Sequence, residues 1–323
     1  MTEQQIHYFL TLVEEKSFSK AAKRLYVTQP SFSQFIMKIE NQLGAKLIDR
    51  KSSPVKLTAA GEAYYQAALQ TKAIHDNLKN RIADLEDLKY GTLRIGTTPF
   101  RGSTLLSKSV YQFHKEYPTV AISIFEGTVE EVSHGVQNGE IDIGIASGEF
   151  DEQVFHVEVL SGEKLYLAVP DGNRLSDQLA EYRITADDIL HNTLRLLKVP
   201  DCSISDFQQE SFIVFEQGEN ITRLTAKLLA EANLQPTISL RTRNLNTVMS
   251  FVLAGMGIAL IPDSFIKYGN LRLHPSYYSI KSRYVQNEIC LIMRKNRYLT
   301  KAAMMYSQIL KQLISSGTWR VYG

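Results

Sequence analysis

Residues 17–58, SFSKAAKRLYVTQPSFSQFIMKIENQLGAKLIDRKSSPVKLT, combine two helical patterns, a tight turn and a basic hairpin. Ser17 is expected to cap a first helix over 18–25, because its hydroxyl can accept a hydrogen bond from a free amide of the first turn. Thr28 is expected to cap a second helix that runs to about Glu40. The stretch therefore predicts two short helices that cross closely, followed by a wing.

The second helix has one apolar and one polar face. Phe32, Ile36 and Ile39 recur at helical spacing and are expected to be buried. Glutamine side chains on the opposite face suit adenine edges in a major groove, a proline suits a thymine methyl, and serine and lysine suit phosphates. The cations of the hairpin suit a minor groove. The residues expected to contact DNA are Ser19, Thr28, Gln29, Pro30, Ser31, Ser33, Gln34, Lys38, Arg50, Lys51, Ser53 and Pro54.

The helix pair also has a plainer interpretation. Two helices with a polar outer face occur in many all-helical cores, and the motif alone produces false positives. Net charge is +2 for the chain, and residues 1–58 hold nine Lys or Arg against five acids. Residues 1–58 are therefore basic and the rest of the chain is slightly acidic, which fits binding of a polyanion by residues 1–58. An ordinary solvent-exposed surface can have the same excess of basic residues.

From Ile6 to Tyr64 the chain resembles the winged helix-turn-helix of LysR-type transcriptional regulators. QIHYFLTLVEEKSF, AAKRLYVTQPSFSQ, IENQLGAKLIDR and LTAAGEAY stand in that family's order and spacing. Two positions depart from the pattern. The family usually has Arg where Gln34 stands, which changes the expected operator sequence, and usually has Phe where Ile48 stands, an apolar exchange that keeps the wing packed.

The stretch 59–89 is expected to form one long helix, because it lacks proline and repeats apolar residues every three or four positions. About 30 residues span roughly 45 Å, more than one small domain covers. The apolar stripe can pack on the chain's own C-terminal domain or on a second subunit. The resemblance implies the second arrangement, a dimer that presents two recognition helices to an inverted-repeat operator. The expected dimerisation residues are Ile74, Leu78, Ile82 and Leu85.

The remaining residues alternate strand and helix patterns, which predicts a mostly parallel sheet with helices on both faces. Strands are expected over 92–96, 120–125, 141–146, 164–169, 212–215, 237–240 and 288–294, and helices from near Thr104 and over 129–138, 186–190, 220–232, 245–254 and 300–314. The chain leaves a first lobe near Leu160 and returns near Phe265. Two crossovers of this kind predict two α/β lobes around a cleft.

GEIDIGIA and VLAGMGIALIP resemble the effector-binding domain of the same family, itself similar to type 2 periplasmic binding proteins. The fold class is thus α plus α/β, with an N-terminal winged helix-turn-helix, a long linker helix and a two-lobed C-terminal domain. The expected domains are 1–58, 59–89 and 90–323, with lobe I at 90–160 and 266–323 and lobe II at 161–265. Residues 194–209 look longer than usual for the family and are expected to form a surface loop.

Ligands of open α/β sheets bind beyond the carboxyl ends of strands, where helix N-termini offer free amides. The loop 97–103 is the strongest candidate, because two hydroxyls and a guanidinium gather there and suit a carboxylate or other small anion. Each hydroxyl or amide could instead only cap a helix. The candidate effector-binding residues are Thr97, Thr98, Arg101, Ser103, Glu126, Thr128, Gln217, Asn246 and Thr247.

No enzyme signature stands in the sequence: G-x-S-x-G, P-loop GK[ST], H-E-x-x-H and a G-x-G-x-x-G after the first strand are all absent. Cys202 and Cys290 lack partners at ligand spacing, so no metal, cofactor or disulfide is expected. No run of about 18 apolar residues occurs, which favours a cytoplasmic protein without a membrane partner. The resemblance implies a dimer or tetramer responding to a small-molecule effector, with RNA polymerase as a further partner. The alternatives are a solute-binding or enzymatic domain fused to a DNA-tethering module, and a ligand-independent DNA-binding protein.

Overall fold

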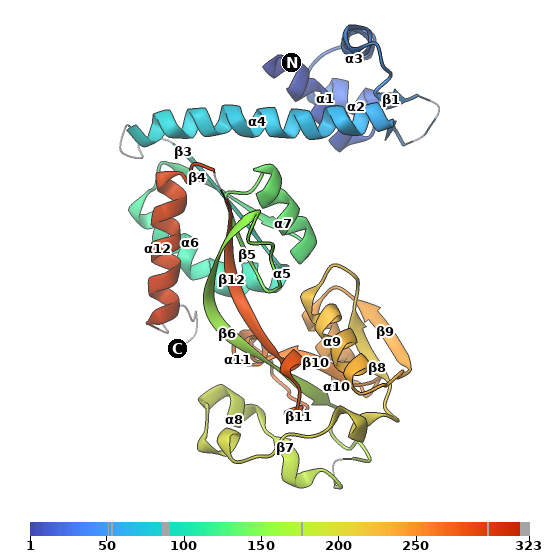
Figure 1. The fold of residues 1–323 in the computed structure, drawn as a ribbon, viewed down its shortest axis with the longest axis vertical. Helices are drawn as coiled ribbons and strands as arrows, with labels where there is room; N and C mark the ends of the chain where they lie inside the picture. Colours follow the sequence, from blue (N-terminus) through green and yellow to red (C-terminus); the bar gives the residue numbers. More distant parts are fainter. Residues whose placement is uncertain (51, 53, 86–90, 176, 296, 317–323) are drawn as a thin grey trace. The chain divides into compact units, whose positions relative to one another are not determined.

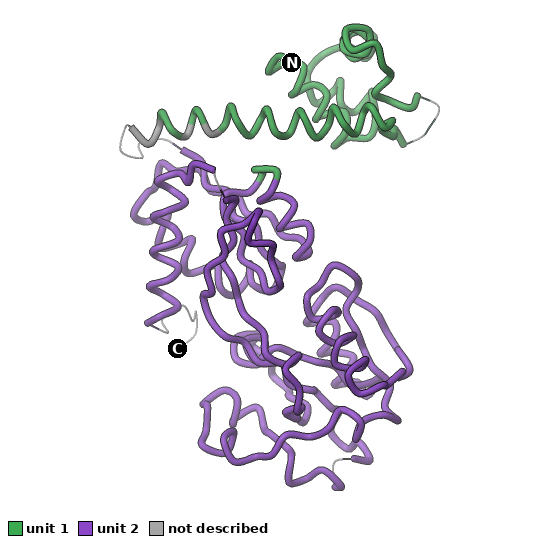
Figure 2. The backbone as a smooth tube through the Cα atoms, in the orientation of Figure 1, with its two compact units in different colours: residues 1–87, 138–140 green, residues 88–137, 141–323 purple. Residues whose placement is uncertain are grey.

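The computed structural model describes residues 1–50, 52, 54–85, 91–175, 177–295 and 297–316 (Figure 1). The chain divides into two compact units, residues 1–87 with 138–140 and residues 88–137 with 141–323 (Figure 2). Among the described residues, no helix is both long and apolar enough to cross a membrane.

The N-terminal unit contains two cap-initiated helices and a short hairpin, as the sequence predicts. The Ser17 hydroxyl accepts a hydrogen bond from the Lys20 amide at 3.4 Å, and the Thr28 hydroxyl accepts one from Ser31 at 3.3 Å. Gly44, with φ +67°, ends the second helix three residues later than predicted. The elements are α1 (Glu3–Glu15), α2 (Phe18–Arg24), α3 (Gln29–Leu43), β1 (Ile48–Asp49), β2 (Lys56–Leu57) and α4 (Ala59–Leu85).

The core of this unit contains the apolar face of α3. Phe32, Ile36 and Ile39 are at most 2% exposed and share a cluster with Phe9 of α1, so their predicted burial is confirmed. The long helix α4 crosses this core at Gly61. A Cβ there would lie 1.9 Å from the backbone carbonyl oxygen of Leu47, so only glycine permits this approach.

A buried carboxylate joins α3 to the wing. Glu40 is 2% exposed, and its Oε1 accepts hydrogen bonds from the amides of Leu47 at 2.9 Å and Ile48 at 3.3 Å. Its Oε2 accepts from Arg50 Nη2 at 3.1 Å and Lys46 Nζ at 3.3 Å. Burial raises the pKa of Glu40, but these four donors outweigh burial and hold the pKa below its ordinary value of 4.5.

The C-terminal unit contains the remaining elements. Its helices are α5 (Pro99–Arg101), α6 (Ser107–Glu116), α7 (Val129–Asn138), α8 (Ala186–His191), α9 (Asn220–Glu231), α10 (Leu245–Leu253), α11 (Asp263–Tyr268) and α12 (Lys301–Ser315). Its strands are β3 (Gly91–Thr97), β4 (Val120–Glu126), β5 (Ile143–Ala146), β6 (Phe155–Val169), β7 (Arg183–Ile184), β8 (Phe212–Phe215), β9 (Ile238–Thr242), β10 (Ala259–Pro262), β11 (Ser276–Tyr278) and β12 (Gln286–Arg294).

The main sheet is mixed, so the prediction of a mostly parallel sheet is wrong. Its order is β4-β3-β5-β12-β6-β11-β7, with β10 also paired to β6. Among the ladders between described strands, only β3 with β4, β3 with β5, and β8 with β9 are parallel. The chain passes from the first lobe to the second along β6 and returns along β12. The strand β12 therefore runs antiparallel to β6, and it is also antiparallel to β5.

Two long strands connect two groups of helices within this unit (Figure 1). The first half of β6 pairs with β12 over one core, and its second half pairs with β10 and β11. Leu165, Leu167 and Val169 face one core of the second lobe, whereas Tyr166 and Ala168 face another. The second lobe therefore has a core on each face of its sheet.

The predicted return of the chain near Phe265 is wrong. Phe265 and Ile266 pack with Tyr166 and Tyr277 in a core of the second lobe. The return follows β11 and is made by β12, whose Gln286 pairs with Lys164. Local patterns did not show this, because β11 is a short buried strand that extends the second lobe.

Two further expectations differ from the structure. The helix after β3 begins at Pro99 instead of Thr104, because Thr98 is extended and Pro99 suits the first turn, and Gly102–Leu106 forms a π-helical turn before α6. Residues 194–209 are not simply a surface loop. They contain 3-10 turns at Leu194–Leu197 and Ile204–Phe207, and Phe207 is fully buried with Cys202 in a core.

Replacing Glu40 with Gln is expected to destabilise the N-terminal unit by about 1 to 3 kcal/mol, because a charged hydrogen-bond acceptor for Arg50 is lost. The amides of Leu47 and Ile48 should lose protection in hydrogen exchange of the full chain. Glu14→Gln is the control, since Glu14 forms an exposed ion pair with Arg24.

The same contact should be sensitive to acid. The folded pKa of Glu40 is lowered, so its contribution is complete above the ordinary value of 4.5 and is lost as pH falls through the folded value. Equal acid sensitivity of wild type and Glu40→Gln at the Leu47 and Ile48 amides would contradict this role.

Candidate functional sites

The outward face of α3 is polar and accessible. Gln29, Pro30, Ser31, Gln34 and Lys38 are exposed, and Ser33 is half-buried. The Ser19 hydroxyl donates to Gln29 Oε1 at 2.8 Å. This contact orients the Gln29 amide and leaves its nitrogen without a hydrogen bond among the described residues.

Two of the predicted DNA-facing groups also have roles within the unit. Thr28 caps α3, and its hydroxyl donates to Ser31 Oγ at 2.9 Å. Arg50 is not a free cation as expected, because it pairs with Glu40, reaches Ser33 Oγ at 3.5 Å and lies over the Phe18 ring at 5.6 Å. Pro54 is exposed, whereas Lys51 and Ser53 lie outside the described residues.

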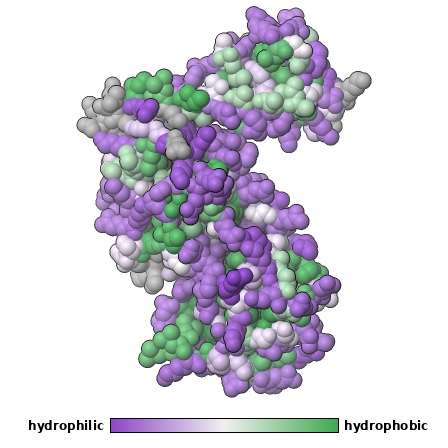
Figure 3. All heavy atoms as spheres, viewed as in Figure 1, coloured by the Kyte–Doolittle hydropathy of each residue, from purple (hydrophilic) through white to green (hydrophobic). Residues whose placement is uncertain are grey.

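The helix α4 exposes an apolar stripe. Ile74, Leu78 and Ile82 are 65%, 58% and 54% exposed, an unusual degree for large aliphatic side chains that recur along one helix. Figure 3 shows this hydrophobic surface over the C-terminal half of α4, within a largely hydrophilic surface. The side chain of Leu85, the fourth predicted member, lies outside the described residues.

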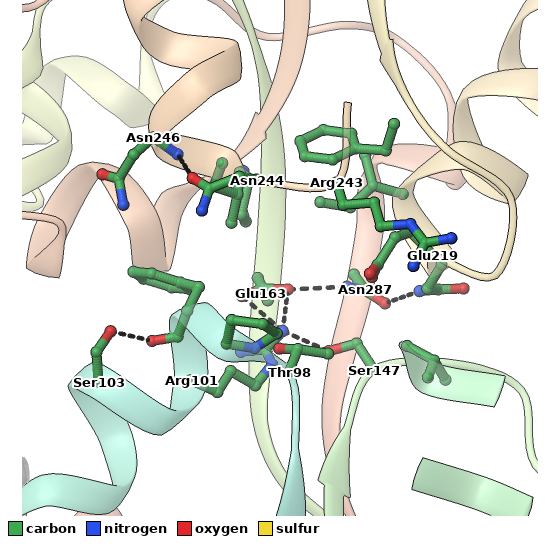
Figure 4. A pocket seen from close by; sticks show the side chains of 18 residues that line it. Thr98, Arg101, Ser103, Ser147, Glu163, Glu219, Arg243, Asn244, Asn246 and Asn287 are labelled. Carbon is green, nitrogen blue, oxygen red and sulfur yellow. Dashed lines mark hydrogen bonds and ion pairs between the residues drawn. The ribbon is translucent and has the colours of Figure 1, made fainter. Parts of the chain in front are cut away.

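A cavity of about 120 Å³ lies in the C-terminal unit between residues of its two lobes (Figure 4). This is roughly ten times the space that one ordered water requires. Its lining consists of Thr98, Pro99, Phe100, Arg101, Ser103, Val129, Ser147, Glu163, Phe215, Glu219, Asn220, Ile221, Arg243, Asn244, Leu245, Asn246, Pro262 and Asn287.

A buried ion pair forms one side of the cavity. Arg101 and Glu163 are 8% and 3% exposed, and Arg101 Nη2 donates to Glu163 Oε2 at 3.0 Å and to Ser147 Oγ at 2.7 Å. Glu163 also accepts hydrogen bonds from Ser264 Oγ and from Asn287 Nδ2. Burial raises the pKa of Glu163, but Arg101 and these hydroxyl and amide donors outweigh it and lower the pKa. Arg101 is thus paired inside the wall, and its guanidinium is not the free partner for a carboxylate that the sequence suggested.

The network continues into the second lobe. Asn287 on β12 donates to Glu163 at 2.8 Å and accepts from Asn220 Nδ2, at the start of α9, at 2.9 Å. Hydrogen bonds therefore run without a break from α9 through β12 and β6 to Arg101. Figure 4 shows Glu163 and Asn287 between the two walls of the cavity.

The opposite wall is formed by the segment before α10 and by Glu219. Asn244 caps α10, with its Oδ1 accepting from the amides of Asn246 at 2.8 Å and Thr247 at 3.2 Å. The sequence left open that Asn246 caps this helix. Because Asn244 is the cap of α10, the Asn246 side chain does not have that role. Arg243 Nε donates to Glu216 Oε2 at 2.6 Å. The Glu219 carboxylate has no hydrogen bond or ion pair among the described residues.

The structure brings together four of the nine candidate effector-binding residues, Thr98, Arg101, Ser103 and Asn246. Thr98 makes no side-chain capping bond. The lining does not include Thr97, Glu126, Thr128, Gln217 or Thr247. Three of these are engaged elsewhere: the buried Thr97 hydroxyl donates to the Ile145 carbonyl, Thr128 accepts from the Glu131 amide, and the Thr247 amide is bonded to Asn244. Glu126 and Gln217 are exposed outside the lining.

Several lining residues were missed from the sequence. Ser147 follows the buried strand β5 directly, so its place at a strand end was a usable signal. Glu163, in the middle of β6, and Asn287, near the start of β12, gave no such signal, because mid-strand polar residues normally face solvent. The described residues contain no cluster of three His, Cys, Asp or Glu side chains able to hold a metal.

Two family descriptions match the chain. Residues 4–62 match the bacterial regulatory helix-turn-helix protein, lysR family, and residues 86–314 match the LysR substrate binding domain. The HTH-type transcriptional regulator YwbI of Bacillus subtilis (strain 168), itself uncharacterized, is 27% identical over 317 residues, 97% of each chain. The HTH-type transcriptional regulator BenM of Acinetobacter baylyi is 28% identical over 270 residues, 82% of this chain and 81% of BenM.

The fold is also similar to that of a solved structure. Full-length CbnR, crystallised in complex with its target DNA, has a TM-score of 0.64 and 20% sequence identity, covering 97% of this chain and 99% of CbnR. The similarity spans both units, and its low identity supports the fold alone.

Proposed function

Because the chain belongs to the LysR family of transcriptional regulators, we propose that α3 reads an operator and that a small molecule in the C-terminal cavity controls the response. The exposed polar face of α3 carries the first part of this proposal. Its opposite face is fixed in the core, and Gln29 is oriented by Ser19. An oriented amide on a rigid helix suits direct contact with a base edge.

The cavity supports the second part. Its walls come from both lobes of the C-terminal unit, and it offers the Thr98 hydroxyl, the Asn246 side chain and the N-terminus of α10. These groups suit a small polar ligand with an anionic group. A ligand that contacts both walls favours one arrangement of the lobes over another, which is how its binding can be linked to the DNA-binding unit.

The exposed stripe of α4 supports self-association. Ile74, Leu78 and Ile82 would be covered by the same helix of a second copy, as in a two-stranded coiled coil. Such a dimer presents two copies of α3 to an inverted repeat in double-stranded DNA. Tetramer formation and contact with RNA polymerase remain proposals by family analogy.

The proposal also includes the absence of enzymatic activity. The relatives are named transcriptional regulators, and we infer that this chain regulates transcription without catalysing a reaction. The Arg101–Glu163 pair is satisfied within the protein, which supports a structural over a catalytic role for these groups. We also propose that the protein acts in the cytoplasm and needs no cofactor.

Gln29→Ala is expected to weaken operator binding by about 1 to 3 kcal/mol and to relax base choice, because one base-edge contact is lost. Lys38→Ala should weaken specific and random DNA alike. Fluorescence anisotropy with an operator and a scrambled duplex measures both. Equal losses on the two duplexes for Gln29→Ala would exclude base reading by this side chain.

Leu78→Asp is expected to raise the dimer dissociation constant by at least about thirtyfold, because a charge would enter an apolar seam. Leu78→Met is the matched control, since it keeps an apolar side chain of similar volume. Analytical ultracentrifugation compares the three proteins. An unchanged association constant for Leu78→Asp would place the seam elsewhere.

Thr98→Val keeps the volume of the side chain but removes its hydroxyl, so effector affinity should fall by about tenfold or more. A thermal-shift screen of organic acids, amino acids and inorganic anions supplies the probe, because binding raises the melting temperature. Thr237→Val, at an exposed position outside the lining, is the control.

Footprinting with the best compound of that screen then tests the response itself. The operator footprint of wild type should change with the compound, and that of Thr98→Val should need about tenfold more compound. A footprint that no compound alters would favour a ligand-independent DNA-binding protein.

A further inference from the structure

Four charged side chains line the cavity, and three of them are neutralised by the protein. Arg101 and Glu163 pair with each other at 3.0 Å. Arg243 pairs with Glu216 at 2.6 Å. Glu219 is the fourth, and it has neither a hydrogen bond nor an ion pair among the described residues. The formal charges of these four side chains sum to zero. Glu219 nevertheless has no cation within ion-pair distance among the described residues.

Partial burial makes the unmatched charge of Glu219 costly. Glu219 is the N-cap residue of α9, yet its side chain accepts no capping hydrogen bond. Burial raises the pKa of this carboxyl, Glu131 adds to the increase, and Arg243 and Arg101 only partly offset it. In Figure 4 the labelled Glu219 lies beside Arg243, on the wall opposite Thr98 and Arg101. A cation from a ligand would supply the missing partner.

Donors of hydrogen bonds are available elsewhere in the same cavity. The Thr98 hydroxyl is not used for capping, and the Asn246 side-chain amide has no hydrogen bond among the described residues. The N-terminus of α10 lies at the lining through Leu245, and it contributes partial positive charge. The hydroxyl and the amide can donate to a carboxylate, and the positive helix end favours this anion over an ammonium group.

We propose that the effector is a small zwitterion of the amino-acid class, with its ammonium group on Glu219 and its carboxylate on Thr98 and Asn246. This inference rests on the proposed function of the cavity. A simple carboxylate would leave Glu219 without a cation, and a simple amine would leave the N-terminus of α10 without an anion. The cavity has room for about ten water molecules, which is enough space for an amino acid.

The test compares matched pairs of ligands on the full chain by thermal shift and titration calorimetry. One panel contains the twenty protein amino acids. The second contains their desamino acids, such as propionate for alanine and succinate for aspartate, and the third the corresponding amines. At least one amino acid should bind, and its desamino acid and its amine should each bind at least about tenfold more weakly.

Variants assign the two ends of the ligand. Glu219→Gln keeps the side-chain volume and should weaken amino-acid binding by about tenfold or more, removing the preference over the desamino acid. Glu219→Asp keeps the charge and should retain that preference. Glu152→Gln, an equal change of charge at an exposed residue outside the lining, should have no effect. Circular dichroism establishes that each variant is folded.

Three results would overturn the proposal: a desamino acid that binds as tightly as its amino acid, full affinity in Glu219→Gln, or no binding by any amino acid. The first two leave ligand control intact, because a ligand still occupies the cavity. After the third result, footprinting with the wider compound set separates the failure of the amino-acid proposal from the failure of ligand control. A footprint changed by another compound would support ligand control, whereas an unaltered footprint would reject ligand control as well.

Discussion

The buried pair of Arg101 and Glu163 is the contact on which the geometry of the C-terminal unit depends. A carboxylate that is 3% exposed is strongly destabilising unless every lone pair is matched. Glu163 meets this condition with donors from α5, β12 and α11 together. Moving any one of these elements would leave charge or polar atoms unpaired in the interior. The pair therefore fixes where the first lobe, the crossing strands and the second lobe meet.

The N-terminal unit uses the same physical device on a smaller scale. Glu40 lies in the core and is matched by two amides and two cations from the wing. Both carboxylates have lowered pKa values for the same reason, because fixed donors outweigh the penalty of burial. Glu219 shows the opposite case. It is partly buried without a partner, and its pKa is raised.

The sequence separation of the contacting residues decides how much of the fold and of the site could be predicted. Helix caps at Ser17 and Thr28 and the apolar face of α3 depend on residues three or four positions apart, and local patterns showed them. Glu163 and Asn287 are 124 positions apart and meet only through the pairing of β6 with β12. Strand pairing at that separation has no local signal. For the same reason the sequence indicated neither the antiparallel strands nor the true return point of the chain.

Coupling between the cavity and the rest of the unit follows from this arrangement. The two walls of the cavity come from the two lobes, which are joined by β6, β12 and the chain of hydrogen bonds from Asn220 to Arg101. A ligand bound at Thr98 on one wall and at Glu219 on the other adds a contact across that joint. Ligand binding can shift the equilibrium between two arrangements of the lobes only by the difference between the binding free energies for these arrangements. Contact with one wall alone would bind equally well in both, so the unmatched charge of Glu219 opposite Thr98 is what makes the cavity suited to a switch.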